Sequence, residues 1–380
     1  MSIETTRTGF SLKDQLFNRN RVEYLAGLFH AADADFDRPG FVKASMKQLT
    51  KLELKERIVH LACTLEGFLS PDYRVAAQQI VAALPPPLDP TKSDDDFGDF
   101  IFAPLGEFVV RNGGSKQHLA VSLRTLKEIT QRFSMEDAIR AFINEHPTQT
   151  MDTLAKWSSN SHYHVRRLVS EGTRPLLPWS KRLTIEPGSA MSLLDALHAD
   201  PTRFVTRSVS NHLNDIAKSD PKAVVETLKR WKQEQKQDSA ELAWMSRHAL
   251  RTLIKQGDPQ TLRFLGFRPN PKIKVSQFTI ERERIKPGEA IEFSFVITAQ
   301  RDEDLIVDYV IDFVKANGVL SPKVHKLKQV TVAKGEFAQL KKKHVLRANA
   351  TTYTLYPGTH RVSLQINGTR FDTATFELVK

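Results

Sequence analysis

The spacing of hydrophobic residues predicts helices over most of the chain. Up to about residue 268, apolar residues recur at every third or fourth position, as in ELKERIVHLACTLEGFL (53–69) and KAVVETLKRWKQ (222–233). This spacing places the apolar side chains on one face of an amphipathic helix. The segment LPPPLDPTKSDDD (84–96) interrupts the pattern, and we interpret it as a loop because proline breaks helices and the acidic end favours solvent.

After residue 270 the pattern changes to short runs in which apolar and polar residues alternate. Turn signals such as KPGE and YPGT separate the runs. The clearest alternating runs are AIEFSFVITAQ (290–300), LIVDYVIDFV (305–314) and HRVSLQING (360–368). They predict a β-sandwich of about seven strands. We therefore expect a mainly α protein with a helical domain over 1–268 and a β-sandwich domain over 271–380.

The helical part contains an internal repeat. The segments HVRRLVSEG (164–172), FVTRSVSNHLNDIAK (204–218) and WMSRHALRTLIK (244–255) align with Arg167, Arg207 and Arg247 at the same position, 40 residues apart. Each segment follows another helix candidate, so the period covers two helices. That period is typical of HEAT-like repeats, which stack into an α-solenoid.

The charge of the chain indicates a polyanionic partner. The sequence carries 55 Lys and Arg against 44 Asp and Glu, a formal net charge of +11. We expect nucleic acid first and an anionic membrane second, and the alternative is charge that serves solubility alone. The repeat arginines either line a DNA-binding groove or hydrogen-bond to neighbouring loops. The DNA-binding candidates are Arg166, Arg167, Arg174, Arg207, Arg247 and Arg251. Arg247 and Arg251 are four residues apart, so we expect one continuous helix that carries both on the same face.

Other features exclude several classes of protein and site. The single cysteine, Cys63, excludes an internal disulfide framework and a cysteine-based zinc site. The pair His162 and His164 lacks a third ligand at metal spacing, so we expect no metal and no cofactor. We find no signal peptide and no membrane-spanning run, and expect a cytoplasmic protein without a membrane partner. Residues 271–380 contain 18 basic against 12 acidic residues, which makes a second DNA contact there plausible.

The segment SHYHVRRLVSEGTRPLLPW (161–179) combines unusual residues for a helix end. Arg167 and Glu171 lie four residues apart and share a helix face, and Gly172 and Pro175 end the helix behind them. The irregular connection that follows could direct Trp179 back to the groove. A carboxylate and an aromatic face in a basic groove suit a cationic ligand. The alternative is a structural Arg167–Glu171 ion pair with Trp179 filling the core.

The string HVRRLVSEGTRPLLPW (164–179) closely resembles the signature of the AlkC branch of the DNA alkylation repair glycosylases. SVSNHLNDIAK (208–218) and WMSRHALRTLIKQGD (244–258) resemble later blocks of that family, and the resemblance is strong over about 100–265. It implies a HEAT-like α-solenoid, and the β-sandwich over 271–380 resembles the immunoglobulin-like domain that some members carry. We expect a monomer of bacterial type, associated with the nucleoid.

The resemblance also implies an activity. Such enzymes remove cationic N3-methylated bases, 3-methyladenine and 3-methylcytosine, from double-stranded DNA as monofunctional glycosylases. The lesion needs no protonation, so the enzyme must stabilise an oxocarbenium-like sugar and position a water molecule. Within the matched blocks the catalytic candidates are Glu171, Trp179 and Asp215, and we add Glu136 from the less similar SMEDAIRAF (134–142).

Some assignments stay open at this point. Asp137 and Asp152 compete with Glu136 for its role. The alternative functions are a non-catalytic nucleic-acid-binding HEAT-repeat protein and a protein-interaction scaffold. Carboxylates in a DNA groove favour the enzyme, because acidic groups weaken DNA binding unless they serve chemistry.

Overall fold

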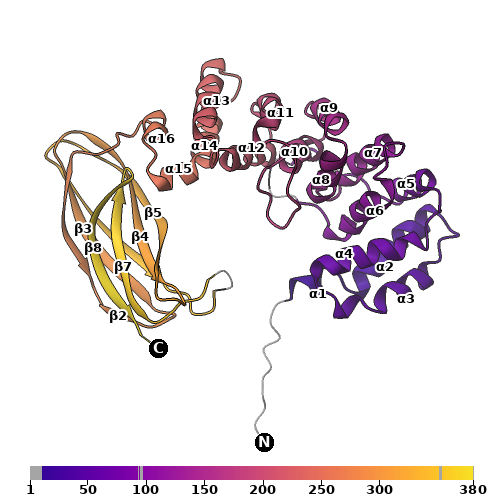
Figure 1. The fold of residues 1–380 in the computed structure, drawn as a ribbon, viewed down its shortest axis with the longest axis horizontal. Coiled ribbons are helices and arrows are strands. Elements are labelled where there is room, and N and C mark those ends of the chain that lie inside the picture. Colours follow the sequence, from indigo (N-terminus) through magenta and orange to yellow (C-terminus); the bar gives the residue numbers. More distant parts are fainter. Residues whose placement is uncertain (1–10, 93, 95–96, 351–352, 380) are drawn as a thin grey trace, which may run out of the picture. The chain divides into compact units, whose positions relative to one another are not determined.

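The computed structural model describes residues 11–92, 94, 97–350 and 353–379, and these form two compact units (Figure 1). The first unit contains the described residues up to Ile216 together with Gln235–Met245, and the second contains Ala217–Glu234 and the described residues from Ser246 onward. The first unit holds helices α1 (Leu12–Leu16), α2 (Arg19–Ala32), α3 (Arg38–Met46), α4 (Leu54–Glu66), α5 (Tyr73–Ala82), α6 (Ala103–Gly113), α7 (Leu119–Thr130), α8 (Glu136–Glu145), α9 (Pro147–Trp157), α10 (Tyr163–Gly172), α11 (Met191–Leu197) and α12 (Arg203–Ile216), with 3-10 turns η1 (Leu49–Lys51), η2 (Phe100–Phe102) and η3 (Pro187–Ala190).

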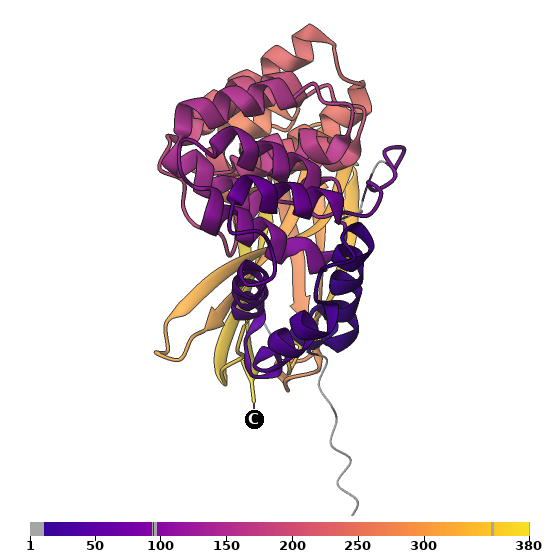
Figure 2. The same ribbon diagram turned by 90° about the vertical axis from the view of Figure 1, so that its right-hand side faces the viewer.

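Helices of the first unit follow one another in chain order as stacked pairs (Figures 1 and 2). The pairs α9–α10 and α11–α12 match the predicted repeat, and α10 packs most closely against α12. Equivalent apolar positions, such as Val165 in α10 and Val205 in α12, are fully buried between neighbouring helices. The HEAT-like α-solenoid is therefore confirmed. None of the described helices is long and apolar enough to cross a membrane.

One predicted helix is wrong. The segment 244–255 was expected to be continuous, but α14 (Ser239–Ala249) ends before Leu250 and α15 (Arg251–Gln256) begins after it. Leu250 has φ −95° and ψ 6°, outside the helical region, and the Arg251 guanidinium donates to the carbonyl of His248 at 2.6 Å. Arg247 and Arg251 therefore belong to different helices and do not share one helix face.

The second unit contains the β-sandwich and the helices α13 (Pro221–Glu234), α15 and α16 (Pro259–Phe264). One sheet has the strand order β1–β3–β6 and the other β2–β8–β7–β4–β5. The strands are β1 (Ile273–Ile280), β2 (Arg284–Ile285), β3 (Ala290–Ala299), β4 (Glu303–Val314), β5 (Leu320–Val332), β6 (Phe337–Val345), β7 (Gly358–Ile366) and β8 (Thr369–Leu378). In β3 every second residue is buried, as the alternation predicts, and residues such as Phe293 and Phe295 fill the core between the sheets.

Strand β4, which lies between β7 and β5, departs from alternation and is buried on both faces over most of its length. The outer face of its sheet is covered by the preceding helical segment, because Gln365 donates to the carbonyl of Lys255 in α15 at 2.9 Å and Asn367 donates to that of Arg268 at 3.0 Å. The change from helix to strand near 270 is confirmed. The division into independent domains at 268 and 271 stays a prediction, since α15 packs within the same compact unit as the sandwich.

Candidate active site

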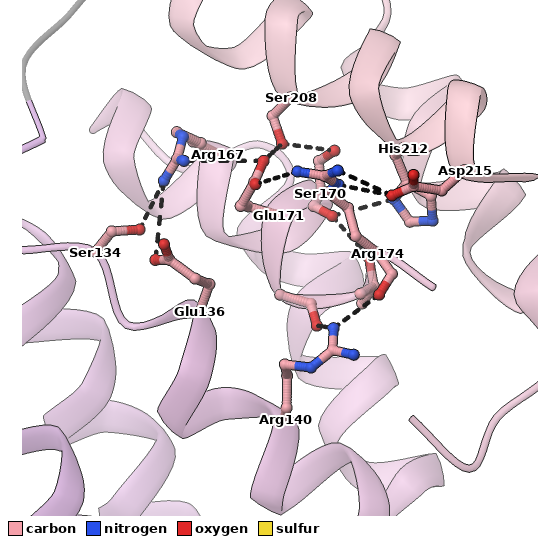
Figure 3. A network of polar contacts seen from close by, with 12 residues as sticks. Ser134, Glu136, Arg140, Arg167, Ser170, Glu171, Arg174, Ser208, His212 and Asp215 are labelled. Carbon is pink, nitrogen blue, oxygen red and sulfur yellow. Dashed lines mark hydrogen bonds and ion pairs between the residues drawn. The ribbon is translucent and has the colours of Figure 1, made fainter. Parts of the chain in front are cut away.

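Three helices bring the candidate carboxylates to one site: Glu136 begins α8, Glu171 lies in the last turn of α10, and Asp215 lies in the last turn of α12 (Figure 3). Helix α10 is capped by His162, the residue before its first turn, whose side chain accepts a hydrogen bond from the backbone N–H of His164. The helix ends at Gly172, where a Cβ atom would lie 2.4 Å from Ile139 Cγ2, so only glycine lets α10 approach α8 this closely. The prediction that the helix stops just behind Glu171 is confirmed.

Arg174 connects two of the three carboxylates. Its Nη1 donates to Glu171 Oε1 at 2.6 Å, while its Nε and Nη2 lie 3.0 and 2.9 Å from Asp215 Oδ2. All three residues are less than a tenth exposed. Because charge-assisted hydrogen bonds in a desolvated site are strong and directional, Arg174 holds the two carboxylates in a defined arrangement.

Glu171 is buried but ionised. Burial by itself would raise its pKa, yet the charges of Arg167 and Arg174 and a hydrogen bond from Ser208 outweigh burial and hold the pKa below its usual value. The Ser208 hydroxyl donates to Glu171 Oε2 at 2.6 Å, and Arg167 Nη2 lies 3.8 Å from the same oxygen. The site therefore maintains a desolvated negative charge at neutral pH.

Glu136 is the most accessible of the three carboxylates. Its side chain is 26% exposed, against 7% for Glu171 and 3% for Asp215. Its Oε2 atom lies 3.9 Å from Arg167 Nη1 and has no hydrogen-bond partner, whereas Arg167 Nη1 donates to the Ser134 hydroxyl at 2.6 Å. Because Oε2 is itself shielded from solvent, a water molecule or a substrate would approach Glu136 from the exposed part of its side chain. Its sequence competitors Asp137 and Asp152 are both exposed.

A buried arginine that sequence reasoning missed supports the segment behind α10. Arg140 donates to the carbonyls of Gly172, Arg174 and Lys181, at 3.1, 2.7 and 2.7 Å. It thereby fixes the turn from which Arg174 reaches the carboxylates. The sequence did hold a signal for Arg140, because it lies four residues after Glu136 and therefore on the same face of the helix. Ser208 and His212 were also missed and lack such a signal; the Ser208 hydroxyl donates to Glu171, and His212 Nδ1 donates to the Ser170 carbonyl at 3.1 Å.

Trp179 lies on the irregular connection after α10. Its side chain is 87% exposed and its φ is +69°, a left-handed conformation that non-glycine residues rarely adopt. Lys55, at the start of α4, donates a hydrogen bond to the Trp179 carbonyl. Core filling, the alternative reading of this residue, is therefore wrong. The indole is free of the core and stands at the surface.

The six predicted DNA-binding arginines divide by burial. Arg166 binds Asp200 with two nitrogens, at 2.5 and 3.1 Å, and also contacts the loop before α10. Arg167 and Arg174 are buried beside the carboxylates. Arg207 forms an ion pair with Asp94, Arg251 donates to the His248 carbonyl, and Arg247 is exposed. The contacts of the buried arginines are intramolecular, whereas Arg247 faces solvent.

The His162–His164 pair has a structural role. His162 Nδ1 accepts from the His164 backbone, and its Nε2 lies 3.1 Å from the Leu88 carbonyl, so both ring nitrogens are used. Within the described part of the chain, no group of three or more His, Cys, Asp or Glu side chains could hold a metal ion.

Comparison with protein families yields two matches. Residues 125–253 match the family described as DNA alkylation repair enzyme, which includes α8, α10 and α12. Residues 274–380 match the C-terminal Ig-like domain described for the uncharacterised protein YhaZ. The second match identifies the β-sandwich as immunoglobulin-like.

Individual relatives match over nearly the whole chain. The uncharacterized protein YhaZ of Bacillus subtilis (strain 168) is 30% identical over 368 residues, which cover 96% of this chain and 98% of YhaZ. The structure of Pseudomonas fluorescens alkylpurine DNA glycosylase AlkC, bound to DNA containing an abasic site analog, is 33% identical. That match has a TM-score of 0.87 and covers 98% of this chain and 100% of the other.

Proposed function

Because this chain belongs to the AlkC-type family of DNA alkylation repair enzymes, we propose that it hydrolyses the N-glycosidic bond of cationic N3-methylated bases in double-stranded DNA. The proposed substrates are 3-methyladenine and 3-methylcytosine. The proposed enzyme is a monofunctional, cofactor-free glycosylase that acts as a monomer in the cytoplasm. One observation carries the proposal: Glu171 is a buried carboxylate that two arginines keep ionised.

An ionised, desolvated carboxylate suits this reaction. An N3-methylated base is already positively charged, so it leaves without being protonated, and positive charge develops on the sugar. Three carboxylates, Glu136, Glu171 and Asp215, contact the guanidinium groups of Arg167 and Arg174, and these ion pairs hold the negative charges in fixed positions. Preorganised charge of this sign, shielded from water, stabilises an oxocarbenium-like transition state.

The carboxylates take different parts in the proposed reaction. Glu171 and Asp215, fixed by Arg174, provide the stabilising charge. Glu136 is the best placed to orient the attacking water, because its side chain is the most exposed of the three. The exposed Trp179 indole offers a π-face to a cationic base or sugar. Among the arginines, Arg247 and Arg207 are the candidates for phosphate contacts, because the others are more deeply engaged within the protein.

A non-catalytic DNA-binding protein is the second candidate. The ion pairs between Arg174 and the two buried carboxylates favour it, since they would also stabilise the packing of α10 on α12. Such a protein would bind DNA with a steep salt dependence but release no base.

The test is release of free base from alkylated DNA. Duplexes containing 3-methyladenine or 3-methylcytosine are incubated with excess protein, and released bases and abasic sites are quantified against a no-enzyme control. The glycosylase is expected to release both base and abasic site in equal amounts, without strand cleavage. Tight binding with no release would establish the second candidate instead.

A further inference from the structure

Phe97 is an exposed aromatic side chain beside the candidate active site. Its side chain is 52% exposed, yet its ring packs edge-on against Phe204 of α12 with ring centroids 5.2 Å apart. The guanidinium carbon of Arg167 lies 4.4 Å from the Phe204 ring centroid and 5.7 Å from that of Phe97. Arg167 therefore contacts two aromatic rings, one from the core and one from a surface loop.

The backbone next to Phe97 is firmly held. Gly98 has φ +78°, and a Cβ atom there would lie 2.0 Å from the carbonyl oxygen of Arg132, so no other residue fits without displacing the loop. Gly98 also forms a β-bridge with Phe133, and Asp99 N–H donates to the same Arg132 carbonyl at 2.9 Å. The position of Phe97 is consequently set by a close contact between two backbone segments.

The same loop contacts the end of α7 and two of the helices that carry the site, α10 and α12. Leu88 N–H donates to the Gln131 carbonyl at 2.9 Å, and His162 Nε2 lies 3.1 Å from the Leu88 carbonyl. Asp94 forms an ion pair with Arg207 of α12. Asp94, at the acidic end that we expected to be solvated, is partly exposed and pairs with the repeat arginine, and residues 95–96 lie outside the described residues.

The two rings cover one side of the Arg167 guanidinium. They contact each other edge-on with centroids 5.2 Å apart, and the guanidinium carbon lies 4.4 and 5.7 Å from them, so both rings lie on the same side of it. The Arg167 side chain is only 8% exposed, and its guanidinium nitrogens lie 3.9 Å from Glu136 and 3.8 Å from Glu171. A charge screened from water acts more strongly on its neighbours than an exposed one does.

We propose that Phe97 is a positioning residue for the site: with Phe204 it forms an aromatic cover over one side of the Arg167 guanidinium and keeps it away from water, toward Glu136 and Glu171. The effect on catalysis rests on the proposed function, whereas the aromatic cover itself can be tested without it. Removing the outer ring should admit water to Arg167 and weaken its hold on both carboxylates.

The first experiment measures the accessibility of Arg167 directly. Phenylglyoxal modifies accessible guanidinium groups, and peptide mass spectrometry gives the rate at each arginine. The Phe97→Ala variant should be modified at Arg167 at least about fivefold faster than the wild type, because the cation–π cover is lost. The Phe337→Ala variant, which removes a 67% exposed phenylalanine from β6, is the matched control and should leave Arg167 protected. If Arg167 is modified by phenylglyoxal at the wild-type rate in folded Phe97→Ala protein, the aromatic cover is overturned, whatever the enzymatic activity.

The second experiment measures the consequence for catalysis. Single-turnover release should fall about tenfold in Phe97→Ala, with the loss larger at pH 5 than at pH 7.5, because a solvated Arg167 lowers the pKa of Glu171 less. The charged and titratable groups around Glu171 are Arg167, Arg174, Glu136, Arg140, His212 and Asp215. A merely structural role for Phe97 would lower the melting temperature without changing the pH profile.

A double-mutant cycle then separates positioning from direct DNA contact. In a Glu171→Gln background, Phe97→Ala should reduce the rate by clearly less than tenfold, because the charge that Arg167 supports has been removed. A full tenfold loss in that background would show that Phe97 acts independently and would overturn positioning. The Phe97→Leu variant keeps apolar cover but no π-face, so it guards against a folding defect in Phe97→Ala. Wild-type protein that releases no base would refute the proposed function. The phenylglyoxal rates would still show whether Phe97 covers Arg167.

Discussion

Replacing Glu171 by glutamine removes one charge from the site while preserving volume. The amide can still accept from Ser208 Oγ or from Arg174, which lie 2.6 Å from the two carboxylate oxygens. The transition state loses one preorganised electrostatic contact, and such a loss typically lowers the rate about 100-fold or more. We therefore expect single-turnover release of 3-methyladenine to fall by about that factor.

The same substitution should also destabilise the protein. Breaking a buried ion pair costs about 3–5 kcal/mol when a charge is left without compensation. Arg174 keeps Asp215 as a partner at 2.9 Å, so we expect the smaller value of about 2–3 kcal/mol. Because Glu171 has a lowered pKa, its stabilising contribution is present above the unfolded-state pKa of about 4.5 and disappears as the pH falls through the folded-state value.

Rate and stability are separated by assay conditions and by a control. Base release is measured at 25 °C, where both variants are folded, and melting temperatures are recorded in parallel. Ser208→Ala removes one hydrogen bond to Glu171 but leaves its charge, so it should lose stability with much less loss of rate. Near wild-type release from folded Glu171→Gln protein would refute the catalytic assignment, and a large melting shift alone would identify a structural ion pair.

Three further predictions concern other parts of the chain. Arg247→Ala should flatten the salt dependence of duplex binding by about one unit per phosphate contact, because Arg247 is exposed. Arg167→Ala, at a buried site, should mainly lower the melting temperature. Equal salt slopes for Arg247→Ala and wild type would count against a phosphate contact. Trp179→Ala should lose rate and selectivity for the cationic lesion, measured against undamaged duplex, with stability unchanged within about 0.5 kcal/mol because the indole is exposed. Burial raises the pKa of Asp308 to about 6, and the charges of Lys255 and Lys326 oppose this only partly. The stability of the protein should therefore decline as the pH rises from about 4 through 6. Asp308→Asn should remove this decline and gain up to about 3 kcal/mol at pH 7.5, and an unchanged pH–stability curve would contradict the assignment.

Much of the fold was predictable because it depends on local spacing. Burial of one helix face requires apolar residues at every third or fourth position, and burial of one strand face requires them at every second position. Both patterns occur in the sequence. The helix pairs around Arg167 and Arg207 and the alternating strand β3 therefore agree with the structure. The break at Leu250 was not predictable, because the apolar spacing continues across it.

The sequence by itself determined the repeat, the helical stop behind Glu171 and the signature over 164–179 that resembles the family. Only the tertiary structure decided which arginines face inward, because that depends on where their acidic partners lie: Asp200 for Arg166 and Asp215 for Arg174 are 34 and 41 residues away. It also placed Phe97 over Arg167, 70 positions later in the chain. Contacts between residues so far apart in the sequence depend on how the helices stack and on where the loops pack against them. The local spacing of residues predicts neither.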